Sequence, residues 1–552
     1  MTVQEISRHT TPAGRPQHTA PHETLAGLGA MSRLFWRRNR VRLVVWAVFV
    51  IAMVGYVISY YQSIFTTQAS LDDFARVSDT PGIKALTGLA ANPATMGGAV
   101  WTKIWMFVAV ALAIGVVFLV TRNGRADEET GRTELLRSRV LGLHAGSVAT
   151  WSWVAGLCVV AGLGTALVSA AMGLDPAGTG ITGSLLFGLS VTGAGLFGLG
   201  VGAVAGQVTS TSRGANTLGS VVVVGFYVLR MVGDLGNGAL TWASPIGWAQ
   251  QVEPWGADRW WPLALLVALT AALLAVAGLI EARRDHGAGL LPERLGNPGA
   301  PRRWASPLGL ALRLQRGPIA GWTVAVVLTA GLFGSVVESM TDLLDDAAAS
   351  ATDLIGGTGV DALLAMLTGL IALVVAVFAV QSAVSLRGDE ATAILEPQLA
   401  GAVGRVRWAA QRLVIPVVGS AVLLAVGGAI FGASYGSTVS DPSQAARLAG
   451  AALAYWPAIM VLTGVAVLLF GYLPRLAVAL SWGVIAAVWF LMFVGDALGL
   501  PQSLLDVLPW SATPYVPLEP LTWTPLIVMT VVAAAFVALG LRRFRARDLQ
   551  PA

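Results

Sequence analysis

A short run of charged residues occurs twice in the chain, with the same internal spacing and an offset of 262 residues. The first copy comprises Arg125, Asp127, Glu128, Thr130 and Glu134, and the second comprises Arg387, Asp389, Glu390, Thr392 and Glu396. Carboxylates and guanidinium groups at such spacing form ion pairs and charge-assisted hydrogen bonds. Since each copy follows an apolar stretch of membrane-spanning length, we interpret the runs as two docking elements for a partner.

In the first loop, residues 122–139, acidic residues come first and arginines come later. This order suits a short helix whose dipole is complemented at both ends. A solvated turn would explain one such loop, whereas two at matched positions favour a partner that docks twice. The predicted coupling residues are Arg125, Asp127, Glu128, Glu129, Arg132, Glu134, Asp389, Glu390 and Glu396.

The second copy is degenerate. Ala393 and Ile394 replace Gly131 and Arg132, and Pro397 ends any helix soon afterwards. We therefore expect the two loops to dock with unequal strength.

The chain has no motif of its own for ATP hydrolysis or metal chemistry. The only lysines are Lys84 and Lys103, and neither follows glycine as a phosphate-binding loop requires. The lone Cys158 excludes an internal disulfide and a cysteine metal cluster. We predict no catalytic residue, no metal site and no cofactor in this chain.

Two cations fall inside apolar runs, each within a few residues of the expected outer end: Lys103 and Arg230. One interpretation is that they extend to the outer headgroups. The other is that they line an external gate or attract an anionic substrate.

The composition places the chain in a membrane. It has 552 residues, of which 55% are apolar and only 12% charged, which leaves too little polar surface for a soluble globule. We predict an all-α integral membrane protein with twelve spans at about 41–60, 99–120, 146–172, 183–206, 216–232, 261–280, 319–337, 361–380, 413–432, 448–470, 477–494 and 523–541.

Arginine sets the expected orientation. The N-terminal flank, the loop after the second span, the central linker and the C-terminal tail are arginine-rich and fall on one side of a twelve-span arrangement, whereas the other side is acidic. By the positive-inside rule, both termini are expected in the cytoplasm of a plasma-membrane protein. The excess of basic residues therefore indicates topology and not nucleic-acid binding.

The two halves of the chain look duplicated. Arg213 matches Arg475, and Val232-Gly233-Asp234 matches Val494-Gly495-Asp496, at the same offset of 262. Parallel six-span repeats related by a pseudo-twofold axis along the membrane normal are expected. The predicted parts are a disordered N-terminus at 1–23, half one at 24–280, a linker at 281–306, half two at 307–541 and a cytoplasmic tail at 542–552.

A substrate path is expected along that axis. Bulky, soft side chains on the second and fifth spans of each half are candidates to line it, although each one could instead face lipid or a neighbouring helix. They are Trp105, Met106, Phe107, Tyr227, Met231, Phe378, Trp489, Phe490 and Phe493.

The segment Leu34-Phe35-Trp36-Arg37-Arg38, the loop from Arg125 to Arg139 and the six-span half resemble actinobacterial antibiotic-exporter permeases of ATP-binding-cassette systems, of the tetronasin-exporter type with fused halves. The resemblance implies an interfacial helix before the first span and a coupling helix after the second. It also implies a partly re-entrant segment between the fifth and sixth spans, at Ser244 to Trp248 and, in half two, at about Trp510 to Pro514.

On this basis we expect the membrane subunit of an exporter for hydrophobic or amphipathic compounds. A separate pair of ATPase subunits, which hold ATP and Mg²⁺, would drive it. The main alternative is an ATP-independent secondary drug transporter, for which the spans lack the ionisable residues in mid-membrane that proton coupling usually needs. A membrane scaffold or sensor is a third reading.

Overall fold

The computed structural model describes residues 24–79, 84, 87–89, 92–137, 141–176, 178–285, 287–291, 299, 301, 304, 306–348, 359–392, 394–401, 403–494 and 501–550. All regular structure in these residues is helical. The segment 1–23, expected to be disordered, lies outside them, as do Arg139 and Asp496. The chain forms two compact units, residues 1–295 and 296–552, whose boundary falls in the expected linker.

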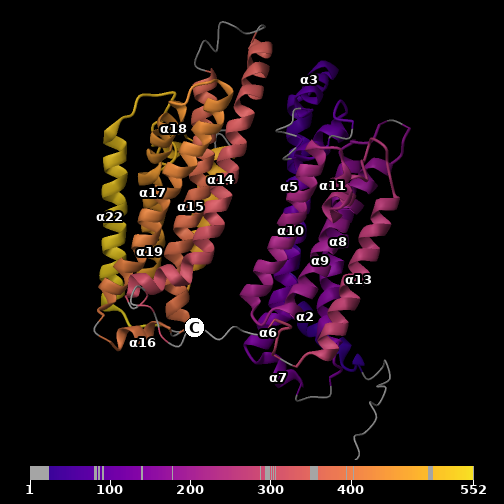
Figure 1. Cartoon of the computed structure of the whole chain (residues 1–552), viewed down its shortest axis with the longest axis horizontal. Helices are drawn as coiled ribbons and strands as arrows, with labels where there is room; N and C mark the ends of the chain where they lie inside the picture. The colour runs from indigo at the N-terminus through magenta and orange to yellow at the C-terminus, as the bar shows by residue number, and fades with distance from the viewer. Residues whose placement is uncertain are drawn as a thin grey trace, which may run out of the picture. The chain divides into compact units, whose positions relative to one another are not determined.

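Unit 1 is a bundle of long helices with short helices at both ends (Figure 1). Its helices are α2 (Leu28–Ile64), α3 (Gln68–Ser78), α5 (Met96–Asn123), α6 (Arg125–Glu129), α7 (Arg132–Arg137), α8 (Ala145–Ala171), α9 (Thr182–Val208), α10 (Ser212–Leu235), α11 (Ala239–Trp242), α12 (Pro245–Gln250) and α13 (Trp261–Arg283).

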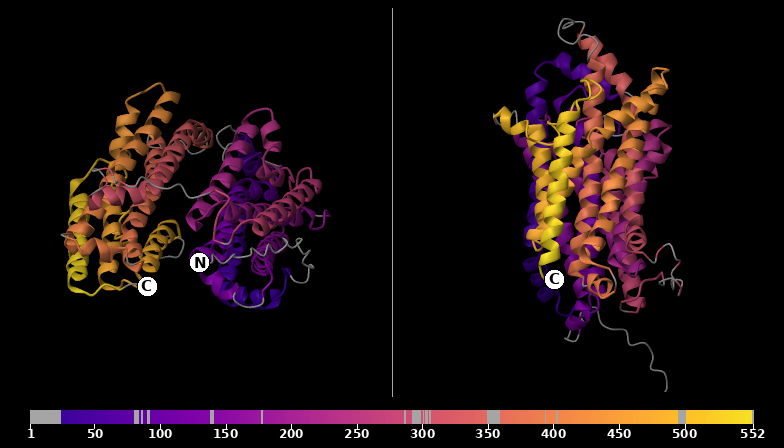
Figure 2. Two further views of the ribbon diagram at one scale, coloured as in Figure 1. Left: turned by 60° about the horizontal axis from the view of Figure 1, so that its bottom comes forward. Right: turned by 90° about the vertical axis from the view of Figure 1, so that its left-hand side faces the viewer.

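Unit 2 repeats this plan. Its helices are α14 (Pro307–Ala348), α15 (Gly359–Ala391), α16 (Leu395–Leu399), α17 (Arg405–Thr438), α18 (Gln444–Leu453), α19 (Trp456–Tyr472), α20 (Ala477–Val494), α21 (Gln502–Leu505) and α22 (Trp523–Ala546). Two further views show that the long helices within each unit run side by side (Figure 2).

The prediction of an all-α membrane protein is confirmed. Eleven helices of the described residues are long and apolar enough to cross a membrane, and Ala477–Met492 is a shorter apolar helix at the place of the eleventh predicted span. The tenth predicted span consists of α18 and α19, which are separated by Ala454 and Tyr455 just before Pro457. Proline tolerates this position because its missing N–H would have no helical partner there.

The beginning of the chain differs from the expectation of a separate interfacial helix. α2 runs without interruption from Leu28 to Ile64. Its buried residues recur every three or four positions, as in Leu43, Ala47, Val50 and Val54, and so form one face that packs mainly on α8. The opposite face is apolar and exposed, as lipid contact requires.

Glycine allows the central helix of unit 1 to be surrounded closely. α9 packs against α5, α8, α10, α12 and α13. A Cβ at Gly188 would collide with the backbone of Gly162 on α8, and a Cβ at Gly162 would collide with Gly188 and Thr192. In unit 2, α19 and α22 meet in the same manner at Gly471 and Gly540. Such close approach lets lipid-embedded helices pack tightly without a hydrophobic driving force.

The two charged loops lie at corresponding ends of the units. α6 and α7 lie at the end of unit 1 opposite α3, and α16 lies at the end of unit 2 opposite α18 (Figure 1). We call these the charged-loop ends. At the other end of unit 1, α11 and α12 fold back against α10, and α12 also packs on α9 and α13, which agrees with the partly re-entrant segment that the resemblance implies.

Candidate functional site

The first charged loop consists of two short helices and not of one. α6 ends at Glu129, and α7 begins at Arg132. Between them Gly131 has a φ of 70°, a left-handed conformation that glycine adopts at little cost. Glycine at this position therefore divides the expected single helix and turns α7 away from α6.

A cluster of three charges fixes this loop to the last helix of unit 1. Glu128 accepts from Arg125 at 2.8 Å and from Arg284, the residue directly after α13, at 2.5 Å. Arg125 also donates to the carbonyls of Gly287 and Ala288 at 2.7 and 3.0 Å. The side chains of Arg125, Glu128 and Arg284 are 1%, 9% and 5% exposed, so the whole cluster is buried.

Unit 2 repeats the cluster. Glu390 binds Arg547, the residue directly after α22, through two bonds of 2.5 and 2.8 Å, and lies 3.4 Å from Arg387. Arg387 donates to the carbonyl of Gln550, whose N–H in turn donates to Glu390. We call each set an arginine clamp: Arg125, Glu128 and Arg284 in unit 1, and Arg387, Glu390 and Arg547 in unit 2.

Sequence reasoning did not identify Arg284 and Arg547. Both are the capping residue at the end of the last span of their unit, with an extended backbone. Ala288 and Gln550, whose carbonyls accept from the clamps, are separated by the same 262 residues as the two loops. Arg547 follows Arg284 by 263 residues, one more than the repeat offset, which pairs Arg284 with Ala546. The repeat comparison finds the clamps only if a shift of one residue is allowed at these helix ends.

The aspartate of each loop has a different partner in each unit. Asp127 binds Arg38 of α2 at 2.6 and 3.1 Å, and beside it Asn39 donates to Asn123 at 2.8 Å. Asp389 instead pairs with Arg412 of α17. Arg38 corresponds to Leu314 in half two, at an offset of 276 because the loop after the first span is longer in half one, and Arg412 corresponds to Thr150 at the offset of 262. Each unit therefore neutralises the same aspartate with an arginine from another helix.

These contacts change the interpretation of the predicted coupling residues. Arg125, Asp127, Glu128, Asp389 and Glu390 are largely buried and bound within the chain. Glu129 is exposed but accepts from the N–H and hydroxyl of Ser212 at the start of α10. The clamps hold the loops, and the surface left for a partner contains Arg132, Glu134 and Leu135 of α7 and Glu396 of α16.

At the other end of unit 1, Arg230 belongs to a buried polar network. Its side chain is 0% exposed and pairs at 2.9 Å with Asp234, one turn later on α10. Asp234 also accepts from Thr241 at 2.6 Å and from Gln250 at 3.0 Å, which ties α11 and α12 to α10. The expectations that Arg230 reaches the headgroups or lines a gate are therefore wrong for this structure. Lys103 is exposed, as either reading of it requires.

The loop between α12 and α13 carries two carboxylates with altered acidity. Burial raises the pKa of Glu253, although Arg259 lies 2.9 Å away and opposes the shift. Burial also raises the pKa of Asp258, which accepts from the N–H of Trp255. Both residues have positive φ, so these bonds stabilise a tight turn.

The candidate path residues fall into two groups. Trp105, Met106 and Phe378 are buried in the helix packing of their own units, and the indole of Trp105 donates to Ser190 at 2.8 Å. They are core residues in this structure, which corrects their assignment to a path. Phe107 and Phe490 are 50% and 54% exposed. Tyr227, Met231 and Trp489 are intermediate, and the side chain of Phe493 lies outside the described residues.

Removing the cation of the buried network should destabilise unit 1. We expect Arg230→Met, which introduces the residue found at the matching position 492, to cost about 3–5 kcal/mol because Asp234 is left buried without its cation. Thermal unfolding of the purified chain measures this. The control is Arg259→Met, which breaks a partly exposed pair worth about 0.2–1 kcal/mol. Equal losses in the two variants would contradict the network.

Two comparisons with known proteins bear on this site. Residues 304–545 match the family model described as the C-terminal domain of the multidrug efflux system permease Rv1217c. The multidrug efflux system permease protein Rv1217c of Mycobacterium tuberculosis is 35% identical over 548 residues, which cover 98% of each chain. The similarity therefore includes both units and both charged loops.

Proposed function

Because the chain belongs to the family of the multidrug efflux permease Rv1217c, we propose that it is the membrane subunit of an ATP-binding-cassette exporter. It moves hydrophobic or amphipathic drugs and antibiotics out of the cell. Two ATPase subunits, which hold ATP and Mg²⁺, drive it from the cytoplasmic side. The observation that carries this proposal is the repeated loop, clamped to the last span in each unit.

The clamps support a mechanical role for the loops. A force on α7 is transmitted to the preceding helix, α6. Arg125 and Glu128 hold α6 to the end of α13. α6 also continues from α5, which packs against the central helix α9. Displacement of the exposed loop by a closing ATPase dimer would therefore move several spans together.

The distribution of charge supports the proposed orientation. Arg38, Arg125 and Arg284 gather at the charged-loop end of unit 1, and Arg387, Arg412 and Arg547 gather at that of unit 2. By the positive-inside rule, this supports a cytoplasmic position for both loops of a plasma-membrane protein. An ATPase that uses cytoplasmic ATP would meet them there.

One observation favours the alternative, a secondary transporter. His144 and Glu281 form a pair of 2.9 Å between the start of α8 and the end of α13. A histidine and a carboxylate in contact are groups that a proton-coupled carrier uses. The pair lies at the charged-loop end and not within the middle of the bundle, so we favour the ATP-driven exporter.

The ATPase partnership predicts a defined complex. The affinity-purified chain should bind no ATP alone and should retain a cytoplasmic ATPase at one permease to two nucleotide-binding subunits. Native mass spectrometry measures this ratio. Substantial ATP hydrolysis by the isolated chain, or drug transport driven by a proton gradient in ATP-free proteoliposomes, would support the secondary transporter instead.

The exposed face of α7 supplies a sharper test in the same complex. Leu135 is 77% exposed, so Leu135→Glu together with Glu134→Arg should leave folding intact. At a docked surface these changes should cost about 2 kcal/mol or more and so lower drug-stimulated ATP hydrolysis at least tenfold. Glu396→Arg is the control from the degenerate second loop and should have a smaller effect. Unchanged hydrolysis in both variants would leave α7 as a solvated turn.

The proposed path predicts changes in substrate preference. Replacing Phe107, Tyr227 or Phe490 by alanine removes apolar contact worth about 1–3 kcal/mol to a bound hydrophobe. Export of the compounds that use this contact should fall, while basal ATP hydrolysis stays unchanged. Phe118→Ala is the control, since Phe118 is also on α5 and 45% exposed but was not assigned to the path. If all four variants export every compound normally, the path lies elsewhere.

A further inference from the structure

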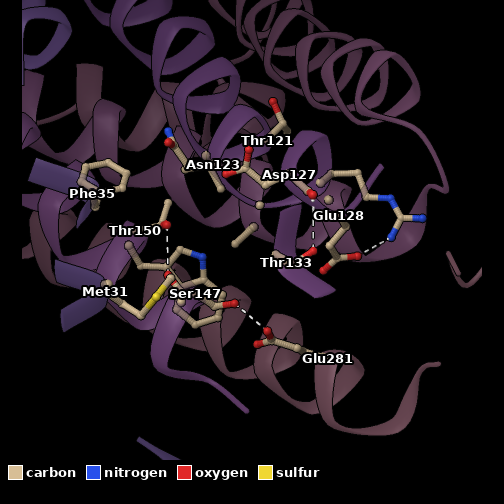
Figure 3. A pocket seen from close by; sticks show the side chains of 18 of the residues that line it. Met31, Phe35, Thr121, Asn123, Asp127, Glu128, Thr133, Ser147, Thr150 and Glu281 are labelled. Carbon is tan, nitrogen blue, oxygen red and sulfur yellow. Dashed lines mark hydrogen bonds and ion pairs between the residues drawn. The ribbon is translucent and has the colours of Figure 1, made fainter. Parts of the chain in front are cut away.

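A cavity of about 110 Å³ lies at the charged-loop end of unit 1. α2, α5, α8, α9 and α13 and the first charged loop contribute to its wall. Its lining includes the apolar side chains of Met31, Phe35 and Trp151. Ser147 and Glu281 are among its polar lining residues (Figure 3). A mostly apolar cavity with a few converging polar groups has the chemistry of a small-molecule site.

Glu281 is a buried carboxylate in this wall that takes no part in the ion pairs of the charged loop. It belongs to the last turn of α13, and its side chain is 6% exposed. One oxygen accepts from the hydroxyl of Ser147 at 2.6 Å, and the other lies 2.9 Å from Nδ1 of His144. Figure 3 shows the bond to Ser147 beside the cavity.

The other buried carboxylates around the cavity each have an arginine. Asp127 binds Arg38, and Glu128 binds both Arg125 and Arg284. Among the described residues, no lysine or arginine lies within ion-pair distance of Glu281. The titratable group paired with it is the ring of His144, and a histidine ring carries a positive charge only when it is protonated. A buried carboxylate without a permanent counter-charge attracts a cation into the space beside it.

Unit 2 has filled the corresponding place. Counted back from the clamp arginines, Phe544 comes three residues before Arg547, as Glu281 comes three residues before Arg284, although the repeat offset of 262 pairs Glu281 with Arg543. Its ring is 0% exposed and lies 4.9 Å from the ring of Phe470 and 6.0 Å from that of Trp408. The repeat therefore accommodates an aromatic core at this position, so packing does not require a carboxylate in unit 1.

We propose that this cavity binds small amphipathic organic cations, with Glu281 as the counter-charge and Phe35, Met31 and Trp151 as the apolar wall. Quaternary and aromatic amines are weakly hydrated and favour aromatic surroundings, so they lose little on leaving water. The physiological role of this site rests on the proposed export function. In that role, the cavity receives cationic substrates at the charged-loop end before they are exported.

The test measures binding to the isolated full chain in lipid nanodiscs, without an ATPase. The probe is tetramethylammonium, a permanent cation small enough for the cavity, and pivalate serves as the anionic comparison. Glu281→Gln removes the charge and keeps the shape and the acceptor for Ser147. Gly206→Leu fills the cavity and leaves Glu281 in place, because a Cβ at Gly206 would meet nothing within 4 Å.

We expect calorimetry to show binding of the cation to the unmodified chain and at least a tenfold loss in both variants. Glu519→Gln, at an exposed carboxylate before α22, should bind as the unmodified chain does. Thermal unfolding identifies any variant that fails to fold, in which case the other variant decides. No binding to the unmodified chain, equal binding by well-folded variants, or equal binding of pivalate would overturn the assignment.

Drug-stimulated ATP hydrolysis separates this inference from the proposed function. With the ATPase present, Glu281→Gln should reduce stimulation by cationic compounds at least tenfold and preserve stimulation by uncharged ones. Loss of the binding difference with hydrolysis intact would overturn the cation site alone. If the cation binds as expected but no ATPase copurifies with the chain, the cation site stands and the exporter is contradicted.

Discussion

The burial of the arginine clamps is the constraint on which the charged-loop ends of both units depend. Moving a carboxylate and two guanidinium groups out of water is costly, and pairing them in good geometry offsets the cost. Glu128 satisfies both oxygens with two arginines that are far apart in the sequence, and Glu390 does the same. If one partner leaves, a buried charge remains, so the loop and the last helix behave as one body.

Around these shared clamps the two units have diverged in polarity. Unit 1 holds the buried Arg230 network, the pair of His144 and Glu281, and a loop aspartate bound to α2. Unit 2 has Met492 at the repeat offset from Arg230, and Phe544 where Glu281 stands when both are counted back from the clamp arginines. Fusion of the halves into one chain permits such divergence. Each half occupies one fixed place in the protein, so its residues need to suit that place only. The differences concentrate the candidate recognition chemistry in unit 1.

The sequence predicted the elements well and their partners poorly. Apolar length and arginine distribution are local properties, and each predicted span overlaps an observed helix, although α2 and α14 begin more than ten residues before the predicted spans. The partner of Glu128 is 156 residues away and that of Glu390 is 157 residues away, so the charge pattern alone did not distinguish docking from internal pairing. Likewise, the environment of Arg230 depends on Gln250 from α12, which folds back against α10, and no periodicity reveals this contact. The division of the first loop was accessible, because Gly131 stands at its centre.

A double-mutant cycle on Glu128 and Arg284 tests the central claim, that the loop charges serve to hold the loop to the last span. The variants are Glu128→Gln, Arg284→Met and their combination, each measured by the free energy of unfolding of the full chain in detergent. The clamp predicts that each single change is costly and that the double variant is about as stable as the worse single one, with a coupling energy of roughly 1–3 kcal/mol. Losses that simply add, with no coupling energy, would show that the two side chains act independently and would contradict the clamp.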